Sequence, residues 1–285
     1  MNASASSSGQ PLYTALVLAG ERGGDNPVAA AAGVRQKCWV PAAGVPMLVR
    51  VVQALSDSTA VGRIVVSMSP AEADQEVPVL DPNQDRKSLE IVPCAATPAT
   101  SVLTAVEALE DPFPLLVTTA DHPLLTAAIV DHFCAACVSI EADIVAGLTP
   151  ARVITAAYPQ TRRTYLKFRD GPRSGANLFA VRTSAGIQAV DFWRRVEHQR
   201  KRPWRIARAF GIWNLGAYLG GWLTVERAMG RVSRVLGTRA VVVDVPFAEA
   251  AIDVDKPDDL ALVEQILRRR EQDQEQDYVH AGSSF

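Results

Sequence analysis

The stretch Tyr13–Ala19 has the sequence YTALVLA and decides the fold, because this continuous apolar run stops at Gly20. A short run rich in Val and Leu that ends at a glycine turn is typical of a strand buried on both faces of a parallel sheet. Helical spacing follows over Pro46–Leu55, and Arg63–Met68 is a second apolar strand. The chain therefore begins with a β–α–β unit.

The same alternation continues through the middle of the chain. Helix, strand, helix and strand are expected in turn over Ser101–Leu109, Pro114–Thr119, Thr126–Cys137 and Ala142–Leu148. This order predicts an α/β fold, in which helices cover both faces of one parallel sheet. Ligands of such sheets bind beyond the carboxyl ends of the strands, so Gly20 and Asp121 are expected at the same edge.

The simple alternation breaks after about Tyr158. Further strands are expected at Tyr165–Phe168, Ala176–Val181 and Arg239–Val245, and helices at Phe192–Ala209 and Pro257–Arg270. We therefore expect a single Rossmann-like three-layer α/β/α domain over residues 12–270, with a basic, Trp-rich helical insertion at about 190–236. Residues 1–11 and 271–285 are polar and are expected to be a disordered leader and tail.

Composition limits the classes of protein to consider. The chain has 285 residues, of which 48% are hydrophobic, and its formal net charge is −2. These values suit one globular domain and argue against a nucleic-acid-binding protein. The chain shows neither a signal peptide nor an apolar run of about 18 residues that would cross a membrane, so the cytoplasm is the expected location.

Four cysteines are too few and too irregular for a disulfide framework. Cys134 and Cys137 form a C-x-x-C pair inside an apolar helical pattern, with no second pair at zinc spacing. A core packing role is therefore favoured over a redox or metal role.

The loop after the first strand, Leu18-Ala-Gly-Glu-Arg-Gly-Gly24, has the character of a phosphate-binding loop. Small residues there let backbone N–H groups approach a triphosphate, and Arg22 and Lys37 would neutralise the charge that builds up as pyrophosphate leaves. The loop does not match G-x-G-x-x-G, which disfavours a dinucleotide fold. An ordinary glycine turn remains the alternative.

Acidic residues supply the second signal. Asp121 follows the strand that ends at Thr119 and is suited to hold Mg²⁺ above the sheet, although a turn residue is the alternative. Asp253 and Asp255 alternate along an extended segment and should share a face, so either would be the second metal ligand. Asp258 and Asp259 begin a helix, where the helix dipole alone favours acids.

The order of these motifs resembles that of nucleotidyltransferases with a GT-A-type fold: LAG-x-R-x-G with a later lysine, an aspartate after the central strand, and D-x-D-x-P-x-D-L before the last helix. The protein is similar to the molybdenum cofactor nucleotidyltransferase-like NTP transferases over roughly Tyr13 to Arg270. The resemblance implies a mainly parallel mixed sheet and a Mg²⁺-dependent enzyme. Such an enzyme would move NMP from CTP or GTP to a phosphorylated sugar, polyol or cofactor precursor and release pyrophosphate.

The resemblance also implies roles for individual residues. The nucleotide-binding residues would be Leu18, Ala19, Gly20, Glu21, Arg22, Gly23, Lys37, Ala96, Ser101 and Asp121. Among them Arg22, Lys37 and Asp121 would be catalytic, Lys37 by stabilising charge on the α-phosphate. Asp121 and Asp255 would bind the Mg²⁺. The sequence departs from the family in its reduced glycine motif and in the longer segment between Arg22 and Lys37, which is either a lid or an exposed insertion.

The acceptor site rests on two segments, which contain Lys167, Arg169, Gly175 and Asn177. The resemblance implies that the glycine turn with an asparagine contacts acceptor hydroxyls. The two basic residues alternate toward one face of an expected strand, where they would bind an acceptor phosphate or form an exposed strand face.

Three questions stay open at this level. Arg194–Arg208 is strongly basic, with Trp193 and Trp204 nearby, and is either a solvated helical face or a surface for anionic lipid or a membrane enzyme. A GT-A glycosyltransferase that uses an NDP-sugar is an alternative function, although the D-x-D typical of that class is absent from the middle of the sequence. A non-catalytic nucleotide-binding or membrane-docking module is another. The oligomeric state is not predicted.

Overall fold

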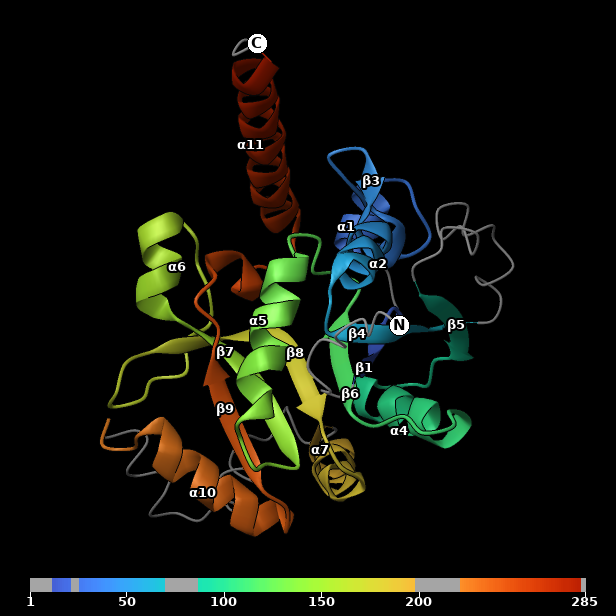
Figure 1. Ribbon diagram of the computed structural model, residues 1–285, viewed down its shortest axis with the longest axis vertical. Coiled ribbons are helices and arrows are strands. Elements are labelled where there is room, and N and C mark those ends of the chain that lie inside the picture. The colour runs from blue at the N-terminus through green and yellow to red at the C-terminus, as the bar shows by residue number, and fades with distance from the viewer. Residues whose placement is uncertain (1–11, 22–25, 70–86, 198–220, 283–285) are drawn as a thin grey trace, which may run out of the picture.

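The computed structural model describes residues 12–21, 26–69, 87–197 and 221–282. Its centre is a seven-stranded sheet in the order β5-β4-β1-β6-β8-β7-β9 (Figure 1). The strands are β1 (Tyr13–Leu18), β4 (Val61–Met68), β5 (Ser88–Pro93), β6 (Leu115–Thr119), β7 (Ile144–Pro150), β8 (Arg173–Val181) and β9 (Ala240–Asp244). Only β8 runs antiparallel to its neighbours among these strands, so the expected mainly parallel mixed sheet is confirmed.

Helices cover both faces of the sheet. α2 (Met47–Asp57) and α5 (Ala127–Val138) pack on the face that carries Ala15 and Val17 of β1. α4 (Pro98–Ala108) and α7 (Ile187–Glu197) pack on the opposite face, which carries Leu16. Successive side chains of β1 thus face opposite helical layers, and because both faces are buried, the strand is apolar throughout. The expected three-layer α/β/α fold is confirmed.

A third apolar cluster closes the carboxyl edge of the sheet. It joins α1 (Pro27–Ala31), the hairpin of β2 (Pro41–Ala42) and β3 (Val45–Pro46), and α11 (Pro257–Gly282). Val28 of α1 and Val40, which precedes β2, pack in this cluster with Val263 and Leu267 of α11. The last helix therefore holds in place the segment that contains Lys37.

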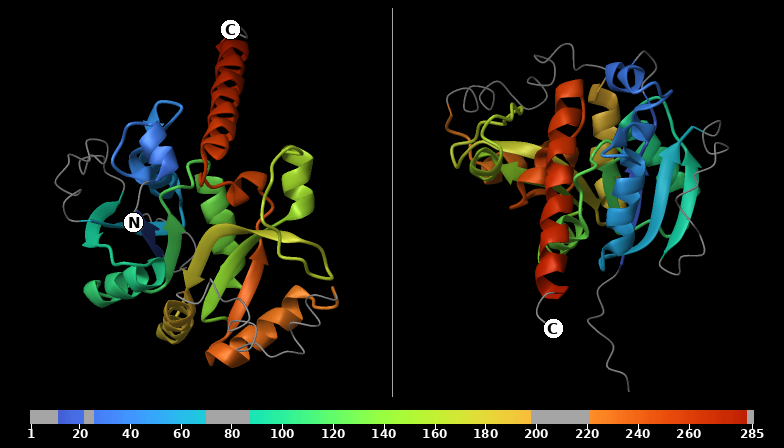
Figure 2. Two further views of the ribbon diagram at one scale, coloured as in Figure 1. Left: turned by 180° about the vertical axis from the view of Figure 1, so that it is seen from behind. Right: turned by 90° about the horizontal axis from the view of Figure 1, so that it is seen from above.

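The tail differs from the expectation. α11 continues to Gly282, well past Arg270, and Figures 1 and 2 show it extending away from the body of the protein. The residues after Arg270 are mostly Glu, Gln and Asp, without a proline or glycine before Gly282, and residues 271–276 are exposed. Good helix formers continue a helix that is already nucleated, even with no apolar face to bury. The prediction of a disordered tail, which used polarity alone, is therefore wrong for residues 271–282. The predicted leader, residues 1–11, lies outside the described part.

Other elements also differ from the sequence prediction. The expected strand Tyr165–Phe168 is only a single bridge, between Leu166 and Arg173, because the following residues leave the sheet and Arg169 N–H donates to Leu223 O. The expected basic helix, Phe192–Ala209, begins earlier, as α7, and its residues 198–209 lie outside the described part. α6 (Ala151–Ala157) was not expected, whereas α10 (Val225–Leu236) lies inside the insertion at about 190–236 that was expected to be helical. Among the described helices none is long and apolar enough to cross a membrane.

Candidate active site

A cavity of about 300 Å³ opens at the carboxyl ends of β1 and β6. Its lining brings together seven residues that the sequence had marked, namely Leu18, Ala19, Gly20, Glu21, Lys37, Asp121 and Asp255. The others are Asn26, Cys38, Pro98, Thr119 and Ala120. Gly20 and Asp121 therefore lie at the same edge of the sheet, as expected. Arg22 and Gly23 lie outside the described residues.

Gly20 is required by a close approach. A Cβ at this position would lie 2.8 Å from Cys94 Cβ and 2.9 Å from Cys94 Sγ, distances that real structures do not tolerate. The glycine thus lets the loop after β1 lie directly against the end of β5.

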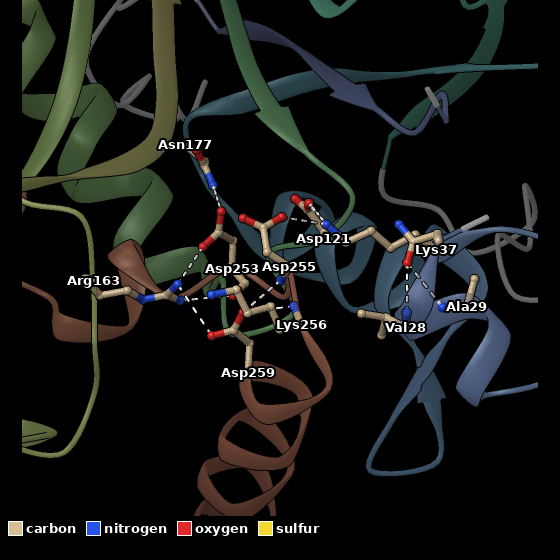
Figure 3. A network of polar contacts seen from close by, with 11 residues as sticks. Val28, Ala29, Lys37, Asp121, Arg163, Asn177, Asp253, Asp255, Lys256 and Asp259 are labelled. Atoms are coloured by element: carbon tan, nitrogen blue, oxygen red, sulfur yellow. Dashed lines mark hydrogen bonds and ion pairs between the residues drawn. The ribbon is translucent and has the colours of Figure 1, made fainter. Parts of the chain in front are cut away.

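Lys37 is the centre of the charged part of the site. It comes from the 3-10 helix η1 (Lys37–Trp39), and its Nζ donates to Asp121 Oδ2 at 2.5 Å and to Asp255 Oδ1 at 3.0 Å (Figure 3). Burial works to lower the pKa of Lys37, but the charge of Asp121 and the hydrogen bonds to both acids outweigh it and raise the pKa. The ammonium is therefore charged and fixed between two carboxylates.

The cavity also presents oxygens that suit a hard cation. Within the described part of the chain, Glu21 Oε1, Thr119 Oγ1 and Asp121 Oδ1 are buried and have no hydrogen-bond partner. No group of three or more His, Cys, Asp or Glu side chains there is arranged to hold a metal by itself. Mg²⁺ characteristically takes only one or two carboxylates and completes its shell with water and phosphate oxygens, so the pair Asp121 and Asp255 fits this ion.

Asp253 and Asp255 do not share a face, contrary to the expectation. Asp255 faces Lys37, whereas Asp253 Oδ1 lies 3.0 Å from an Arg163 nitrogen and its Oδ2 accepts from Asn177 Nδ2 at 3.2 Å. Strand alternation fails because the chain bends at Asp255, where Asp259 accepts from two successive backbone N–H groups. Burial raises the pKa of Asp253, and Arg163 opposes that rise.

A β-bulge brings Asn177 into this network. Opposite β7, β8 pairs Phe179 with Ala146 and Gly175 with Leu148, so three residues of β8 face the single residue between the two on β7. Asn177 lies in the bulge with a left-handed φ of 48°. Bulges re-aim side chains beside functional sites, and here the amide points at Asp253 (Figure 3).

The residues expected to bind the nucleobase and the acceptor differ in their burial and in their distance from the cavity. Ser101 is buried, and its hydroxyl bonds both the N–H and the carbonyl of Ala95, so it shapes the loop that contains Ala96. Gly175 is exposed beside open space on β8. Lys167 and Arg169 are exposed in the segment before β8 and do not line the cavity.

Sequence reasoning missed two polar residues. Asn26 lines the cavity and caps α1, its Oδ1 accepting from the N–H of Val28 at 3.0 Å; the pair Asn26-Pro27 was an available helix-start signal. Arg163 had no such signal, because its partner Asp253 is 90 residues away in the chain.

The histidine beside Asp121 and the C-x-x-C pair both behave as packing residues. His122 is fully buried against Glu249 O at 3.1 Å, and burial lowers its pKa. Cys134 and Cys137 are buried in the core, where burial raises the pKa of Cys137 to about 11, so the thiols stay protonated.

Comparisons with known proteins agree with this geometry. The sequence profile of the MobA-like NTP transferase domain matches residues 15–189. A solved structure of a hypothetical transferase from Thermus thermophilus is 30% identical, with a TM-score of 0.72 over 88% of this chain and 100% of that one. No curated protein matches the chain.

Two more distant structures share the fold. One is 4-diphosphocytidyl-2C-methyl-D-erythritol synthase from Anaerococcus prevotii, 10% identical with a TM-score of 0.57 over 90% of this chain and 98% of that one. The other is CMP:2-keto-3-deoxy-manno-octonic acid synthetase complexed with CTP, 12% identical with a TM-score of 0.56 over 91% of this chain and 100% of that one.

Proposed function

Because the chain belongs to the family of MobA-like NTP transferase domains, we propose that it transfers NMP from CTP or GTP to a small phosphorylated acceptor and releases pyrophosphate. One observation carries this proposal: Lys37 bridges Asp121 and Asp255 inside the cavity at the carboxyl edge of the sheet. When a metal–triphosphate substrate binds, the two carboxylates would exchange the Lys37 ammonium for the metal ion, and the ammonium would bind a phosphate group.

The loop Leu18–Glu21 lines the cavity and would receive the triphosphate against its backbone N–H groups. Asp121 and Asp255 would hold Mg²⁺, which supplies neutralisation of the phosphate charge when bound. The ammonium of Lys37 would then stabilise charge on the α-phosphate as the pyrophosphate departs. The loop between β5 and α4, shaped by Ser101, would meet the base.

An acceptor phosphate oxygen would attack the α-phosphorus in line. A new P–O bond forms, the bond from the α-phosphorus to the bridging oxygen breaks, and pyrophosphate leaves with that electron pair. Such an acceptor is already ionised at pH 7, so the protein needs to supply position and charge and no general base. Asn177 would contact acceptor hydroxyls from the bulge of β8, and Lys167 and Arg169 would lie on the approach to it.

The test is pyrophosphate release with each of four NTPs against a panel of phosphorylated sugars, polyols and cofactor precursors. We expect release with one NTP and one acceptor class, dependent on Mg²⁺ and abolished by EDTA. Asp121→Asn should remove this activity, while Lys256→Met, which removes an exposed charge one residue from Asp255, should keep it. Absence of release in every combination would contradict the proposal.

We also propose that the insertion at 190–236 touches an anionic membrane surface. Trp193 and Trp222, one on each side of residues 198–220, are 51% and 73% exposed, and Arg194 and Arg195, which both pair with Asp191, adjoin Trp193. Aromatic and cationic side chains together favour the lipid interface. Sedimentation with phosphatidylserine-containing vesicles, but not with phosphatidylcholine vesicles, is expected and should weaken in Trp222→Ala. Equal sedimentation with both lipids would refute this.

A further inference from the structure

Arg163 makes a three-point clamp on the segment that carries Asp255. One guanidinium nitrogen donates to the backbone carbonyl of Asp253 at 2.9 Å, and the other lies 3.0 Å from Asp253 Oδ1 and 3.7 Å from Asp259 Oδ1 (Figure 3). The Arg163 side chain is only 9% exposed. Planar guanidinium groups fix the direction of their partners, which a lysine ammonium does not do.

The clamped acids in turn hold the backbone of Asp255. Asp259 Oδ2 accepts from the N–H of Asp255 at 3.1 Å and from that of Lys256 at 3.0 Å. On the other side of the bend, the N–H of Val254 donates to Asp121 O at 3.0 Å. The side chain of Asp255 is 64% exposed and bonds Lys37, so its direction depends on that contact and on the hydrogen bonds that hold the backbone of the bend.

The charges in this network are divided between two cations. Lys37 pairs with Asp121 and Asp255, while Arg163 pairs with Asp253 and Asp259. This leaves the paired groups with two negative charges in excess. Arg163 is absent from the cavity lining, so it does not touch the space where substrate would bind.

We propose that Arg163 is a positioning residue, which sets the affinity of the site for its divalent cation by holding the bend that presents Asp255 toward Asp121. The inference rests on the proposed function, because it concerns the metal used there. Residues that orient metal ligands without contacting the metal typically change affinity about 10- to 100-fold when replaced.

The experiment measures Mn²⁺ binding by electron paramagnetic resonance, with α,β-methylene CTP and α,β-methylene GTP in separate arms. Arg163→Lys keeps the charge but loses the fork. Arg163→Met with Asp253→Asn removes both charges of the closer pair, so that Asp253 is not left as an unpaired charge if the lysine variant fails to fold, while Asp259 keeps its bonds to two backbone N–H groups. Arg162→Met is the matched control, since Arg162 is the exposed neighbour in sequence. Thermal unfolding in EDTA checks each variant for folding.

We expect Mn²⁺ dissociation constants about 10-fold higher for Arg163→Lys and up to about 100-fold higher for the double variant, with Arg162→Met equal to wild type. Wild-type affinity in a folded Arg163→Lys and a folded double variant overturns the positioning role. Wild-type protein that binds no Mn²⁺ in either arm, or an Asp121→Asn variant that binds it normally, overturns the metal site itself and with it the proposed function.

Discussion

Lys37→Met should have opposite effects on metal binding and on turnover. In the ligand-free protein, the Lys37 ammonium bonds Asp121 Oδ2 at 2.5 Å and Asp255 Oδ1 at 3.0 Å, so it takes up both proposed metal ligands. A divalent ion that enters alone must break these two contacts. Methionine has a similar length and no charge, so the variant removes the competitor while keeping most of the packing.

The size of the effect follows from the exposure of the partners. The side chain of Asp255 is 64% exposed, so its pair with Lys37 is screened by solvent and contributes about 0.5 kcal/mol, whereas Asp121 is only 23% exposed, so its pair is screened less and contributes about 1 kcal/mol. Displacing Lys37 therefore costs roughly 1–2 kcal/mol, or about tenfold in affinity. Without nucleotide, Lys37→Met should bind Mn²⁺ about tenfold more tightly than wild type.

Turnover should change in the other direction. With NTP bound, Lys37 would face the α-phosphate, and loss of a charge-stabilising donor typically lowers kcat about 100- to 1,000-fold. Calorimetric titration with Mn²⁺ and pyrophosphate release measure the two effects, and Lys256→Met serves as the charge-matched control. An unchanged or weaker nucleotide-free affinity for Mn²⁺ in Lys37→Met would refute the competition argument, provided that Asp121→Asn abolishes binding.

Two further predictions concern the fold around the site, and both are measured by urea unfolding. Gly20→Ala should destabilise the protein by about 1–3 kcal/mol because the added methyl group would overpack against Cys94. In the Cys94→Gly background the same change should cost much less; if the free-energy costs of the two single variants simply add in the double variant, the cause is not steric. Asp131 accepts from Ser58 Oγ at 2.5 Å and from Ala60 N–H at 3.1 Å, and although burial opposes it, these bonds lower the pKa of Asp131. Asp131→Asn should therefore cost about 1 kcal/mol at pH 7. This difference should be complete above about pH 4, near the unfolded pKa, and should shrink as the pH falls through the lowered folded value. A difference that does not depend on pH below about pH 4 would contradict it.

The parts of the fold that were predictable are those with a local cause. The strands β1 and β6 are apolar runs that end at a glycine and an aspartate, so their type and carboxyl ends were visible in the sequence. The antiparallel placement of β8 between β6 and β7 was not, because pairing depends on contacts between residues far apart in the chain. The helical tail was mistaken for disorder because composition was weighed without helix propensity.

The candidate site shows the same division. Gly20 and Asp121 follow from strand ends alone, whereas the contact of Lys37 with Asp121 joins residues 84 positions apart and has no local cause in the sequence. The separation of Asp253 from Asp255 could not be foreseen, since strand alternation predicts a common face. It depends on three irregular features: a bend at Asp255, the bulge at Asn177 and the unforeseen Arg163.

These irregular features have a common physical consequence. If the segment through Asp253 and Asp255 were a regular strand, both carboxylates would face the cavity and repel each other beside Asp121, which would favour protonation of one of them. The bend turns Asp253 to Arg163 and Asn177, so that one acid stays with Asp121 for a cation and the other anchors the loop. The sequence D-x-D thus contains one proposed ligand, Asp255, and one acid, Asp253, that pairs with Arg163 from another part of the chain.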